Sequence, residues 1–458
     1  MAAASALTIP LAPGPPIVGN VRPMLTALGS FLTTQYRRLG PVFRVPILNH
    51  RPLVLAGPEA NALMKQQGHR LFASGAVMQD IHQVIGGDNP TLIELDGPDH
   101  RTMRAGLKDG YSGRTLYAQM EKLIHSQLNL LQGWPRGVPI PAFAYVKRLV
   151  SSVLGYMATN EEPDEIMDDL IYFFRALVQI HIRKVRPGFM KYLPRYVSSR
   201  RSVLAMVRRI WDEHHVRDHL EHDGDFVDLV RRFHAEHPRL MSERDAVAAL
   251  IGPFIAGMDT AASATSFLLY HILRDPELHR AVVAEADLAF ANGYPDRDSL
   301  RQMIQTRHAA MEILRLHPPA PVLARTSVAP FQFQGYEIPK DEYCLIANTV
   351  THHLPEFFPE PERFDVGRYG PERKEHAQPN VYCPYGLGPH TCLGATTADL
   401  LYLIVSAVLF RHFHVEMQPP DQELHVVMNP LPSPDDRFRI AITGERHPPP
   451  RQQEHPPA

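Results

Sequence analysis

Ten residues towards the C-terminus have the types and spacing needed to hold a thiolate against a metal ion. Cys392 ends a glycine-containing loop that starts at Tyr385, and it is followed by Gly394 and by an apolar stretch from Leu400 to Phe410. Glycines let the backbone approach a flat ligand closely, and the start of a helix favours the negative charge of a thiolate. A lone cysteine is more often a small buried apolar residue, and this alternative stays open for Cys392 on its own.

The other two cysteines, Cys344 and Cys383, have no glycines immediately beside them. The three cysteines show no CxxC spacing, which argues against a structural zinc site, and three in 458 residues are typical of a reducing compartment. The net charge of −2 and the sequence pI of about 7.0 give no sign of a nucleic-acid-binding surface. With 44% hydrophobic residues, the chain can bury a large core.

A second candidate site lies inside the longest apolar segment, which runs from Ala248 to Tyr270 and is expected to form a buried helix. Within it, Asp259 and Thr260 place a carboxyl and a hydroxyl side by side, which is costly in an apolar helix unless both groups are paired or used. The nearby Gly257 would remove a side chain where a ligand could sit. A polar pair satisfied by its surroundings is the alternative.

Two pairs of charged residues have helical spacing. Glu312 and Arg315 lie three apart, and His100 and Arg104 lie four apart, so each pair shares one face of a helix. The planar guanidinium of arginine suits a buried carboxylate, whether from the protein or from a ligand. An ordinary solvated pair on a helix surface is the alternative for both.

These segments, in this order, resemble the cytochrome P-450 superfamily of haem-thiolate monooxygenases. The family pattern aromatic-Gly-x-Gly-x-[His/Arg]-x-Cys-x-Gly matches Tyr385 to Gly394, with Tyr where the family usually has Phe. Glu312 to Arg315, followed by Leu316-His317-Pro318-Pro319, is similar to the ExxR helix of the family. The resemblance covers nearly the whole chain. It implies haem b with Cys392 as its axial ligand, and an axial thiolate favours cleavage of the O–O bond.

The resemblance also implies roles for residues around the haem. Asp259 would relay protons and Thr260 would hydrogen-bond the dioxygen. The haem propionates would be held by His100, Arg104, Arg325 and His390. The cofactor would be lined in addition by Tyr385, Gly386, Gly394 and Ala256.

A structural triad is expected to support the thiolate side of the haem. By resemblance, Glu312 and Arg315 are joined by a downstream arginine, for which the sequence offers two candidates. Arg363 lies in a Pro-Glu-Arg-Phe string that matches the family, and Arg368 lies at the usual distance before the cysteine loop. We favour Arg368, with Arg363 on the surface of the preceding turn.

The substrate pocket of the family is apolar and is gathered from several segments. Carried over to this chain, it would be lined by Met78, Ile81, Ile85, Phe173, Phe174, Val178, Phe254, Ile255, Val322, Leu323 and Leu431. Plain core packing is the alternative for each of them. Such a pocket suits a hydrophobic small molecule of the terpenoid, steroid, fatty acid or polyketide type.

The resemblance implies a monooxygenase that inserts one atom of O2 into such a molecule. No GxGxxG follows a strand and no ferredoxin-like cysteine cluster occurs, so electrons are expected from a separate ferredoxin and its reductase. Arg101, Lys108 and Arg114 are candidates for docking that donor. The alternatives are a peroxygenase or oxygen-independent member, which tends to lose the acid–alcohol pair, a non-catalytic haem sensor or carrier, and a haem-free helical binding protein.

The elements that would position these residues are mostly helical, with a small β-rich region, as in the cytochrome P-450 fold with its long central helix over the haem. We expect a hairpin over residues 42–56, a helix from Pro58 to about Gln67 and a mobile loop over 72–92. Helices follow from 115 to 320 and strands from Phe331 to Asn348.

Residues 1–20 are predicted to be an Ala- and Pro-rich N-terminal segment, 21–445 a single domain, and 446–458 a disordered Pro-rich tail. No Lys or Arg precedes Arg22, and the apolar stretch from Ala2 to Ile9 is too short to span a bilayer. The sequence therefore predicts a soluble, cytoplasmic protein without a transmembrane anchor.

Overall fold

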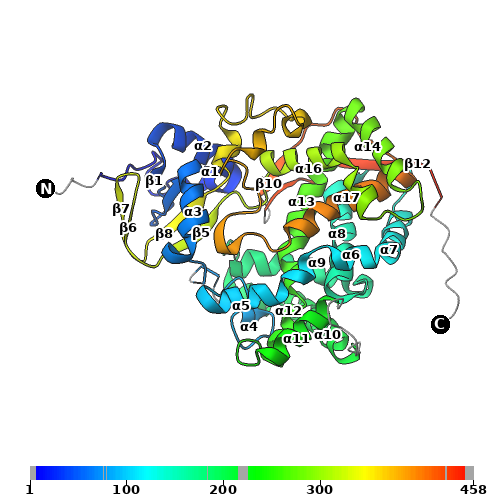
Figure 1. Cartoon of the computed structure of the whole chain (residues 1–458), viewed down its shortest axis with the longest axis horizontal. Helices are drawn as coiled ribbons and strands as arrows, with labels where there is room; N and C mark the ends of the chain where they lie inside the picture. Colours follow the sequence, from blue (N-terminus) through cyan, green and yellow to red (C-terminus); the bar gives the residue numbers. More distant parts are fainter. Residues whose placement is uncertain are drawn as a thin grey trace.

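The computed structural model describes residues 7–448 except 76, 79, 183, 215–224 and 429–430. Helices fill most of the molecule, and most of the strands gather on the side where the N-terminus lies (Figure 1). The expectation of a mostly helical protein with a small β-rich region is confirmed.

The main sheet joins segments that are far apart in the sequence. It has the order β1-β2-β8-β5-β3. Its strands are β1 (Val42–Arg44), β2 (Leu53–Ala56), β3 (Phe72–Ala73), β5 (Leu323–Ser327) and β8 (Tyr343–Ala347). The predicted hairpin is present, with Val42 opposite Leu55, and β2 then pairs in parallel with β8.

Three smaller sheets complete the β structure. β6 (Phe331–Phe333) and β7 (Tyr336–Ile338) form a hairpin, and β10 (Val426–Met428) pairs with β11 (Pro432–Pro434). β12 (Arg439–Glu445) lies between β4 (Ile140–Pro141) and β9 (Phe413–Met417). The predicted strand region at Phe331 to Asn348 is therefore divided among three strands, and β5 precedes it.

The helices range from single turns to the long central helix. They are α1 (Val21–Thr26), α2 (Leu28–Leu39), α3 (Pro58–Leu71), α4 (Ile81–Val84), α5 (Gly97–Leu107), α6 (Arg114–Ala118), α7 (Met120–Gln132), α8 (Ala142–Thr159), α9 (Met167–Leu177), α10 (Pro194–Glu213), α11 (Phe226–Glu236), α12 (Glu243–Ala249), α13 (Gly252–Arg274), α14 (Pro276–Ala289), α15 (Arg297–Arg301), α16 (Ile304–Leu316) and α17 (Ala395–His412). Short 3-10 turns include η1 (Lys108–Tyr111), η4 (Gly188–Tyr192), η6 (Val366–Tyr369) and η8 (Gly388–His390).

The central helix α13 packs against α8, α14, α16 and α17 (Figure 1). It is apolar on nearly all sides, which is the pattern of a helix in the middle of a core. By length and composition, the segments Glu243–Arg274 and Gly388–His412 could each cross a membrane, but about two thirds of each apolar window is buried inside the fold. Both segments therefore read as core helices.

Three local expectations differ from the structure. Helix α3 continues to Leu71, beyond the predicted end at Gln67. The predicted mobile loop over 72–92 contains β3 and α4, although residues 76 and 79 lie outside the described residues. The start of the predicted disordered tail is packed: Arg446 forms an ion pair with Asp287 at 2.9 Å, and its N–H donates to the His412 carbonyl at 2.8 Å. Residues 449–458 lie outside the described part.

Candidate active site

The loop around Cys392 is closed by its own backbone. The Cys392 N–H donates to the Tyr385 carbonyl at 2.8 Å, and α17 begins three residues later at Ala395. Gly388 has a φ of +74°, and a Cβ at this position would lie 2.6 Å from the Met64 carbonyl oxygen of α3. This position therefore requires glycine for both its backbone angle and its space.

Cys392 differs from the other two cysteines in its surroundings. Cys344 and Cys383 are buried, and burial raises the pKa of each thiol to about 12. Cys392 keeps exposed surface although protein surrounds it on most sides, so burial raises its pKa while the Gly394 N–H and Arg104 lower it. A side chain that is enclosed yet accessible faces a recess rather than a packed core.

Ala256 is the matching feature on α13. It is exposed in the middle of a helix whose neighbouring residues Phe254 and Met258 are 1% and 0% exposed. Ala256 is exposed between buried residues, and Cys392 is exposed in a loop that is otherwise partly buried, so both offer surface that a flat ligand could cover. Gly257 was expected to leave room for a ligand, but it faces the protein instead. A Cβ there would lie 3.0 Å from the Leu154 side chain of α8.

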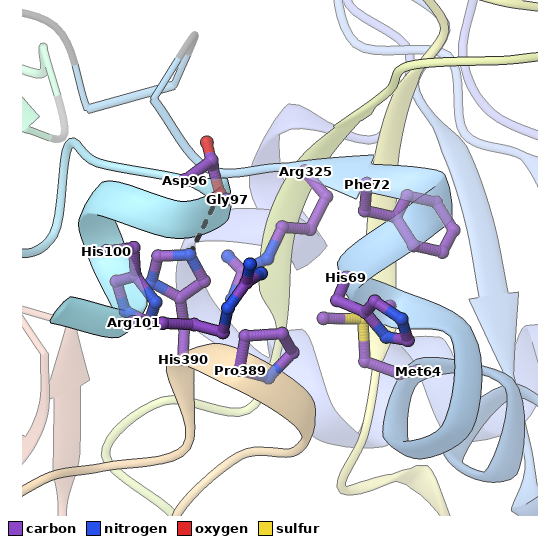
Figure 2. Close-up of a pocket in the computed structure, with 11 residues that line it drawn as sticks. Met64, His69, Phe72, Asp96, Gly97, His100, Arg101, Arg325, Pro389 and His390 are labelled. Atoms are coloured by element: carbon purple, nitrogen blue, oxygen red, sulfur yellow. Dashed lines mark hydrogen bonds and ion pairs between the residues drawn. The ribbon is translucent and has the colours of Figure 1, made fainter. Parts of the chain in front are cut away.

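A cavity of about 90 Å³ next to the cysteine loop collects basic side chains from four parts of the chain. It is lined by His69 of α3, His100 and Arg101 of α5, Arg325 of β5 and His390 of η8. Figure 2 shows Arg101 and Arg325 extending towards the middle of the cavity, beside Pro389 and His390. Arg101 is exposed, as its predicted docking role requires, and it also lines the cavity, which the sequence did not indicate.

Two buried nitrogen atoms of this cavity lack a partner among the described residues. They are Nε of Arg325, whose residue is 5% exposed, and Nε2 of His100, whose residue is 2% exposed. Burial lowers the pKa of Arg325, and burial together with His390 and Arg104 lowers the pKa of His100 to about 4. Unsatisfied buried donors need an acceptor, and a carboxylate from a ligand would supply one.

The other two predicted propionate partners already have partners in the protein. The His390 ring packs against His100 at a tilt of 35°, with centroids 4.1 Å apart, and its Nε2 lies 2.9 Å from Asp96 Oδ1. Arg104 does not line the cavity and instead donates to the Thr391 carbonyl at 2.6 Å. Arg104 thus supports the loop one residue before Cys392. The sequence did not indicate Asp96, because its partner His390 lies far away in the chain.

The acid of the acid–alcohol pair is held in an ion pair that the sequence did not reveal. Lys147 Nζ of α8 lies 2.5 Å from Asp259 Oδ1, and the two side chains are only 7% and 8% exposed. The Lys147 ammonium also lies 4.5 Å from the centre of the Phe143 ring. Thr260 donates its hydroxyl to the Ala256 carbonyl at 2.7 Å. The one sequence signal for Lys147 is a cation inside an apolar run of α8.

A fully buried charge cluster lies beneath the cysteine loop. Arg315 binds Glu312 through two N–H groups at 2.8 Å, and Arg368 Nε donates to Glu312 Oε1 at 3.1 Å, with all three side chains 0% exposed. Tyr369 donates its hydroxyl to Glu312 at 2.8 Å. The side chain of Arg363 is 67% exposed and pairs with a surface carboxylate. Arg368 is therefore the arginine that joins Glu312 and Arg315.

The cluster is connected to the cysteine loop through His352. Burial lowers the pKa of His352 well below its usual value, so the ring is neutral. Its Nδ1 lies 3.2 Å from the Arg315 carbonyl, and its Nε2 accepts the Cys383 N–H at 2.9 Å. Asn348 donates to the Cys383 carbonyl at 2.9 Å. Both the N–H and the carbonyl of Cys383, two residues before Tyr385, are therefore held by side chains.

The predicted substrate-pocket residues do not all lie together. Phe174 and Phe254 stack with ring centroids 6.2 Å apart, and Phe173 packs against Phe174. Leu323 reaches the loop, since a Cβ at Gly386 would lie 3.4 Å from its side chain. Ile81 and Ile85 are buried, whereas Met78, Val178, Ile255 and Leu431 are partly buried. Val322 packs with a separate apolar cluster beside the main sheet.

The predicted docking residues Lys108 and Arg114 are exposed. They flank Tyr111, whose carbonyl accepts the Thr397 hydroxyl at 2.8 Å and whose ring lies beside Gly394. These two cations therefore lie next to the start of α17, close to the cysteine loop.

The sequence comparisons agree with this geometry. The family model described as Cytochrome P450 matches residues 141–439. The chain is 26% identical over 348 residues to cyclooctat-9-en-7-ol 5-monooxygenase of Streptomyces melanosporofaciens, with 74% of each chain covered. It is 24% identical to abscisic acid 8'-hydroxylase 4 of Arabidopsis thaliana, with 91% of this chain and 87% of the relative covered. It is 23% identical to taxane 10-beta-hydroxylase of Taxus cuspidata, with 94% and 88% covered.

Solved structures share the fold at low sequence identity. The retinoic acid-bound cyanobacterial CYP120A1 superposes with a TM-score of 0.79 at 20% identity, covering 96% of this chain and all of that one. The heme domain of cytochrome P450DA gives a TM-score of 0.79 at 19% identity, covering 97% and 99%. At these identities the likeness establishes the architecture.

Proposed function

Because the chain belongs to the cytochrome P450 family, whose members carry haem b on an axial cysteine thiolate, we propose that Cys392 is that ligand in this protein. The observation that carries the proposal is the contrast among the three cysteines. Burial raises the pKa of all three thiols, but Cys344 and Cys383 are buried, whereas Cys392 is accessible and has the Gly394 N–H and Arg104 to lower its pKa in part. Only a thiolate can ligate iron.

Four residues would hold the haem on its polar edge. Arg325 and His100 offer buried donors without a partner, and Arg101 and His390 line the same cavity. A propionate would accept from Arg325 and His100 and would offset the desolvation of the guanidinium. Arg104 would act on the loop rather than on the carboxylates, since it already donates to Thr391.

The protein is a cytochrome P450 monooxygenase. The haem of this family supplies the chemistry that puts one atom of O2 into the substrate and releases the other as water. We assign proton delivery to Asp259 and Thr260. The Asp259 carboxylate lies 2.5 Å from Lys147, so its side chain would have to turn from Lys147 to pass a proton to another group. Thr260 would break its hydrogen bond to the Ala256 carbonyl, so that its hydroxyl could donate to dioxygen instead.

The substrate is proposed to be a hydrophobic small molecule, with a terpenoid as the first choice. The relatives named above are monooxygenases and hydroxylases of terpenoids, and steroids, fatty acids and polyketides are the other apolar classes that such a pocket accepts. Phe174, Phe254 and Leu323 are the candidates for lining the pocket, whereas Val322 is better explained as core packing.

Electrons are proposed to come from a ferredoxin and its reductase in the cytoplasm. Lys108 and Arg114 lie beside the start of α17 and would meet an acidic donor near the thiolate. A peroxygenase or an oxygen-independent activity is disfavoured because such members tend to lose the acid–alcohol pair that this chain retains.

The test is the absorption spectrum of the purified, reduced protein under carbon monoxide. Thiolate-bound haem gives a strongly red-shifted Soret band, and we expect this band from the wild type and from Cys383→Ser. Cys392→Ser should lose the shifted band. A Cys392→Ser protein that keeps it would refute the assignment. A spin-state titration of the Soret band with terpenoids, steroids and fatty acids then identifies the substrate class.

A further inference from the structure

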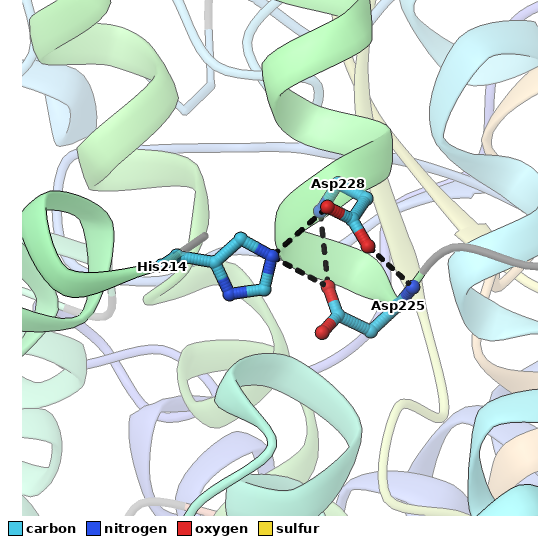
Figure 3. Close-up of side chains that lie close together, drawn as sticks. All are labelled: His214, Asp225 and Asp228. Carbon is cyan, nitrogen blue, oxygen red and sulfur yellow. Dashed lines mark hydrogen bonds and ion pairs between the residues drawn. The ribbon is translucent and has the colours of Figure 1, made fainter. Parts of the chain in front are cut away.

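The end of α10 and the start of α11 bring one histidine and two carboxylates together. Figure 3 shows the His214 ring pointing Nε2 at the side chains of Asp225 and Asp228. This nitrogen lies 2.9 Å from Asp228 Oδ1 and 3.6 Å from Asp225 Oδ1. The nitrogen and one oxygen of each carboxylate lie within 4.8 Å of one another, and no other such group of three occurs among the described residues. All three residue types are common metal ligands.

The N-terminus of α11 holds both aspartates in position. Asp225 caps the helix, and its Oδ1 accepts the Asp228 N–H at 3.0 Å. Asp228 Oδ2 accepts the Asp225 N–H at 3.2 Å in return, which completes a capping box. The other oxygen of Asp228, Oδ1, faces His214. The helix therefore orients two carboxylates toward the same imidazole.

An ion pair between a protonated His214 and the carboxylates is the simpler explanation, but it leaves charge uncompensated. The side chains of Asp225 and Asp228 are only 15% and 5% exposed. Within the part of the chain that the structure describes, neither carboxylate forms an ion pair with a lysine or arginine. One imidazolium offsets one of the two buried negative charges, whereas a divalent cation offsets both.

The distances also suit a metal ion. Zinc binds nitrogen and oxygen ligands at about 2.0–2.2 Å in tetrahedral sites, which places two ligand atoms about 3.3 Å apart. The two measured separations from His214 Nε2, 2.9 and 3.6 Å, lie on either side of this value. The imidazole nitrogen therefore has to move only slightly relative to each carboxylate to share an ion with it.

Two neighbouring features point to a metal independently of the cluster. Asn160 donates through Nδ2 to Asp225 Oδ2 at 3.3 Å, and its buried Oδ1 has no hydrogen-bond partner among the described residues. An amide oxygen beside the carboxylates is thus unused. Residues 215–224, which connect α10 to α11 and lie outside the described residues, include three His and three Asp or Glu among ten positions. Short His-rich tracts are typical of metal-binding segments.

We propose that His214, Asp225 and Asp228 bind a divalent transition-metal ion, with Zn²⁺ as the best match, and that this ion fastens the end of α10 to the start of α11. Imidazole together with carboxylate suits zinc, whereas Mg²⁺ and Ca²⁺ prefer oxygen ligands alone. The carbonyl end of α10 at His214 favours a cation and the amide end of α11 opposes one, so the two carboxylates decide the sign of the site. The inference does not depend on the substrate or on the haem ligand.

The test is zinc binding to the full-length holoprotein after trace metals have been removed with a chelator. We expect equilibrium dialysis and elemental analysis to find one zinc ion per chain in addition to the haem iron. Asp225→Asn and Asp228→Asn each keep an oxygen that can cap α11 but remove one negative charge, and His214→Gln removes the imidazole. Each change should weaken zinc binding by about a hundredfold or more, since even the loss of a group that only supports a ligand costs about ten- to a hundredfold.

The matched control is His82→Gln. His82 Nδ1 lies 3.0 Å from Glu94, so this contact has one histidine and one carboxylate but lacks the second carboxylate. The control should bind zinc like the wild type. Asp225→Asn and Asp228→Asn retain every histidine of residues 215–224, so wild-type affinity in both variants would show that the histidine tract alone binds the ion and would overturn the proposal. A wild type that retains no zinc overturns it as well.

Two further readouts do not depend on enzyme activity. X-ray absorption at the zinc edge should show nitrogen and oxygen ligands at about 2.0–2.2 Å, and a sulfur ligand at about 2.3 Å would place the ion on a cysteine instead. Zinc should raise the urea midpoint of the wild type and of His82→Gln but not that of Asp228→Asn, because the ion stabilises only a fold that binds it. Equal shifts in all three proteins contradict the assignment.

Discussion

Replacing Lys147 with methionine should lower the free energy of unfolding by about 3–5 kcal/mol, because it leaves the Asp259 carboxylate buried without its partner. The pair is short, at 2.5 Å, and both side chains are less than a tenth exposed. Methionine keeps most of the volume and can still pack on Phe143, whose ring the ammonium now covers. The loss therefore reports the unpaired charge rather than a cavity.

A double-mutant cycle isolates the interaction. Asp259→Asn alone leaves the Lys147 ammonium buried and unpaired, so it should cost a similar amount. The double variant Lys147→Met/Asp259→Asn removes both charges and should cost less than the sum of the single changes by about 3 kcal/mol. The neighbouring Arg148, also on α8, is the matched control because it pairs with Asp168 of α9, and these two side chains are 40% and 76% exposed.

Urea unfolding followed by circular dichroism measures the four proteins of the cycle and the Arg148→Met control, and only proteins of equal m-value are compared. Arg148→Met should cost less than about 1 kcal/mol, since exposed ion pairs contribute little. Single changes at Lys147 and Asp259 that add to within about 0.5 kcal/mol in the double variant would show that the pair is not coupled. An Arg148→Met protein as unstable as Lys147→Met would show that the effect belongs to α8 and not to Asp259.

Three further outcomes are expected. Arg368→Lys should lower the free energy of unfolding by about 3 kcal/mol and reduce the haem content of purified protein, because lysine cannot reproduce the guanidinium contacts to Glu312. The control Arg363→Lys, on the surface, should change the free energy of unfolding by less than about 0.5 kcal/mol. Arg325→Leu should release haem to an acceptor apoprotein about tenfold faster, since a bond to a charged group is worth about 1.5 kcal/mol or more; an unchanged rate would contradict its assignment to a propionate. Burial lowers the pKa of His317 to about 3, so its ring stays neutral in the folded protein. In the unfolded chain the same ring binds a proton near its usual pKa of 6.5. The contribution of neutral His317 to the free energy of unfolding is therefore present above pH 6.5 and is lost as the pH falls. His317→Phe should therefore remove about 1.4 kcal/mol per pH unit from the decline in stability between pH 6.5 and pH 5, measured by urea unfolding, and an unaltered slope would refute this.

The sequence predicted the features that local chemistry determines. The cysteine loop follows from a run of residues in which Gly388 can only be glycine, since its backbone angle and its contact with Met64 are both fixed. The hairpin at β1 and β2 follows from two apolar runs joined by a polar turn. The pair Glu312 and Arg315 follows from helical spacing, and the structure places both side chains in contact.

The sequence failed where a contact joins distant segments. Lys147 and Asp259 are 112 positions apart, and neither neighbourhood indicates the other. Arg363 and Arg368 stand in similar local strings; the distance to the cysteine loop favoured Arg368, and its burial against Glu312 confirms that choice. Arg101 is a surface charge as expected, but the sequence did not indicate that it lines the same cavity as Arg325, because α5 and β5 are far apart in the chain. Pairings of this kind depend on topology, which a single sequence leaves open.

Two buried charge groups of the described residues are balanced by ion pairs, whereas Arg325 at the proposed haem edge has none. Glu312 and the nearby Glu375 offset Arg315 and Arg368, and Lys147 offsets Asp259. Arg325 is also buried, but the contact it makes is with a neutral carbonyl, and its Nε has no partner among the described residues. An uncompensated cation of this kind opposes folding until an anion arrives. Haem binding should therefore stabilise the wild type more than it stabilises Arg325→Leu, because in the wild type a propionate removes a penalty that the leucine variant never carries.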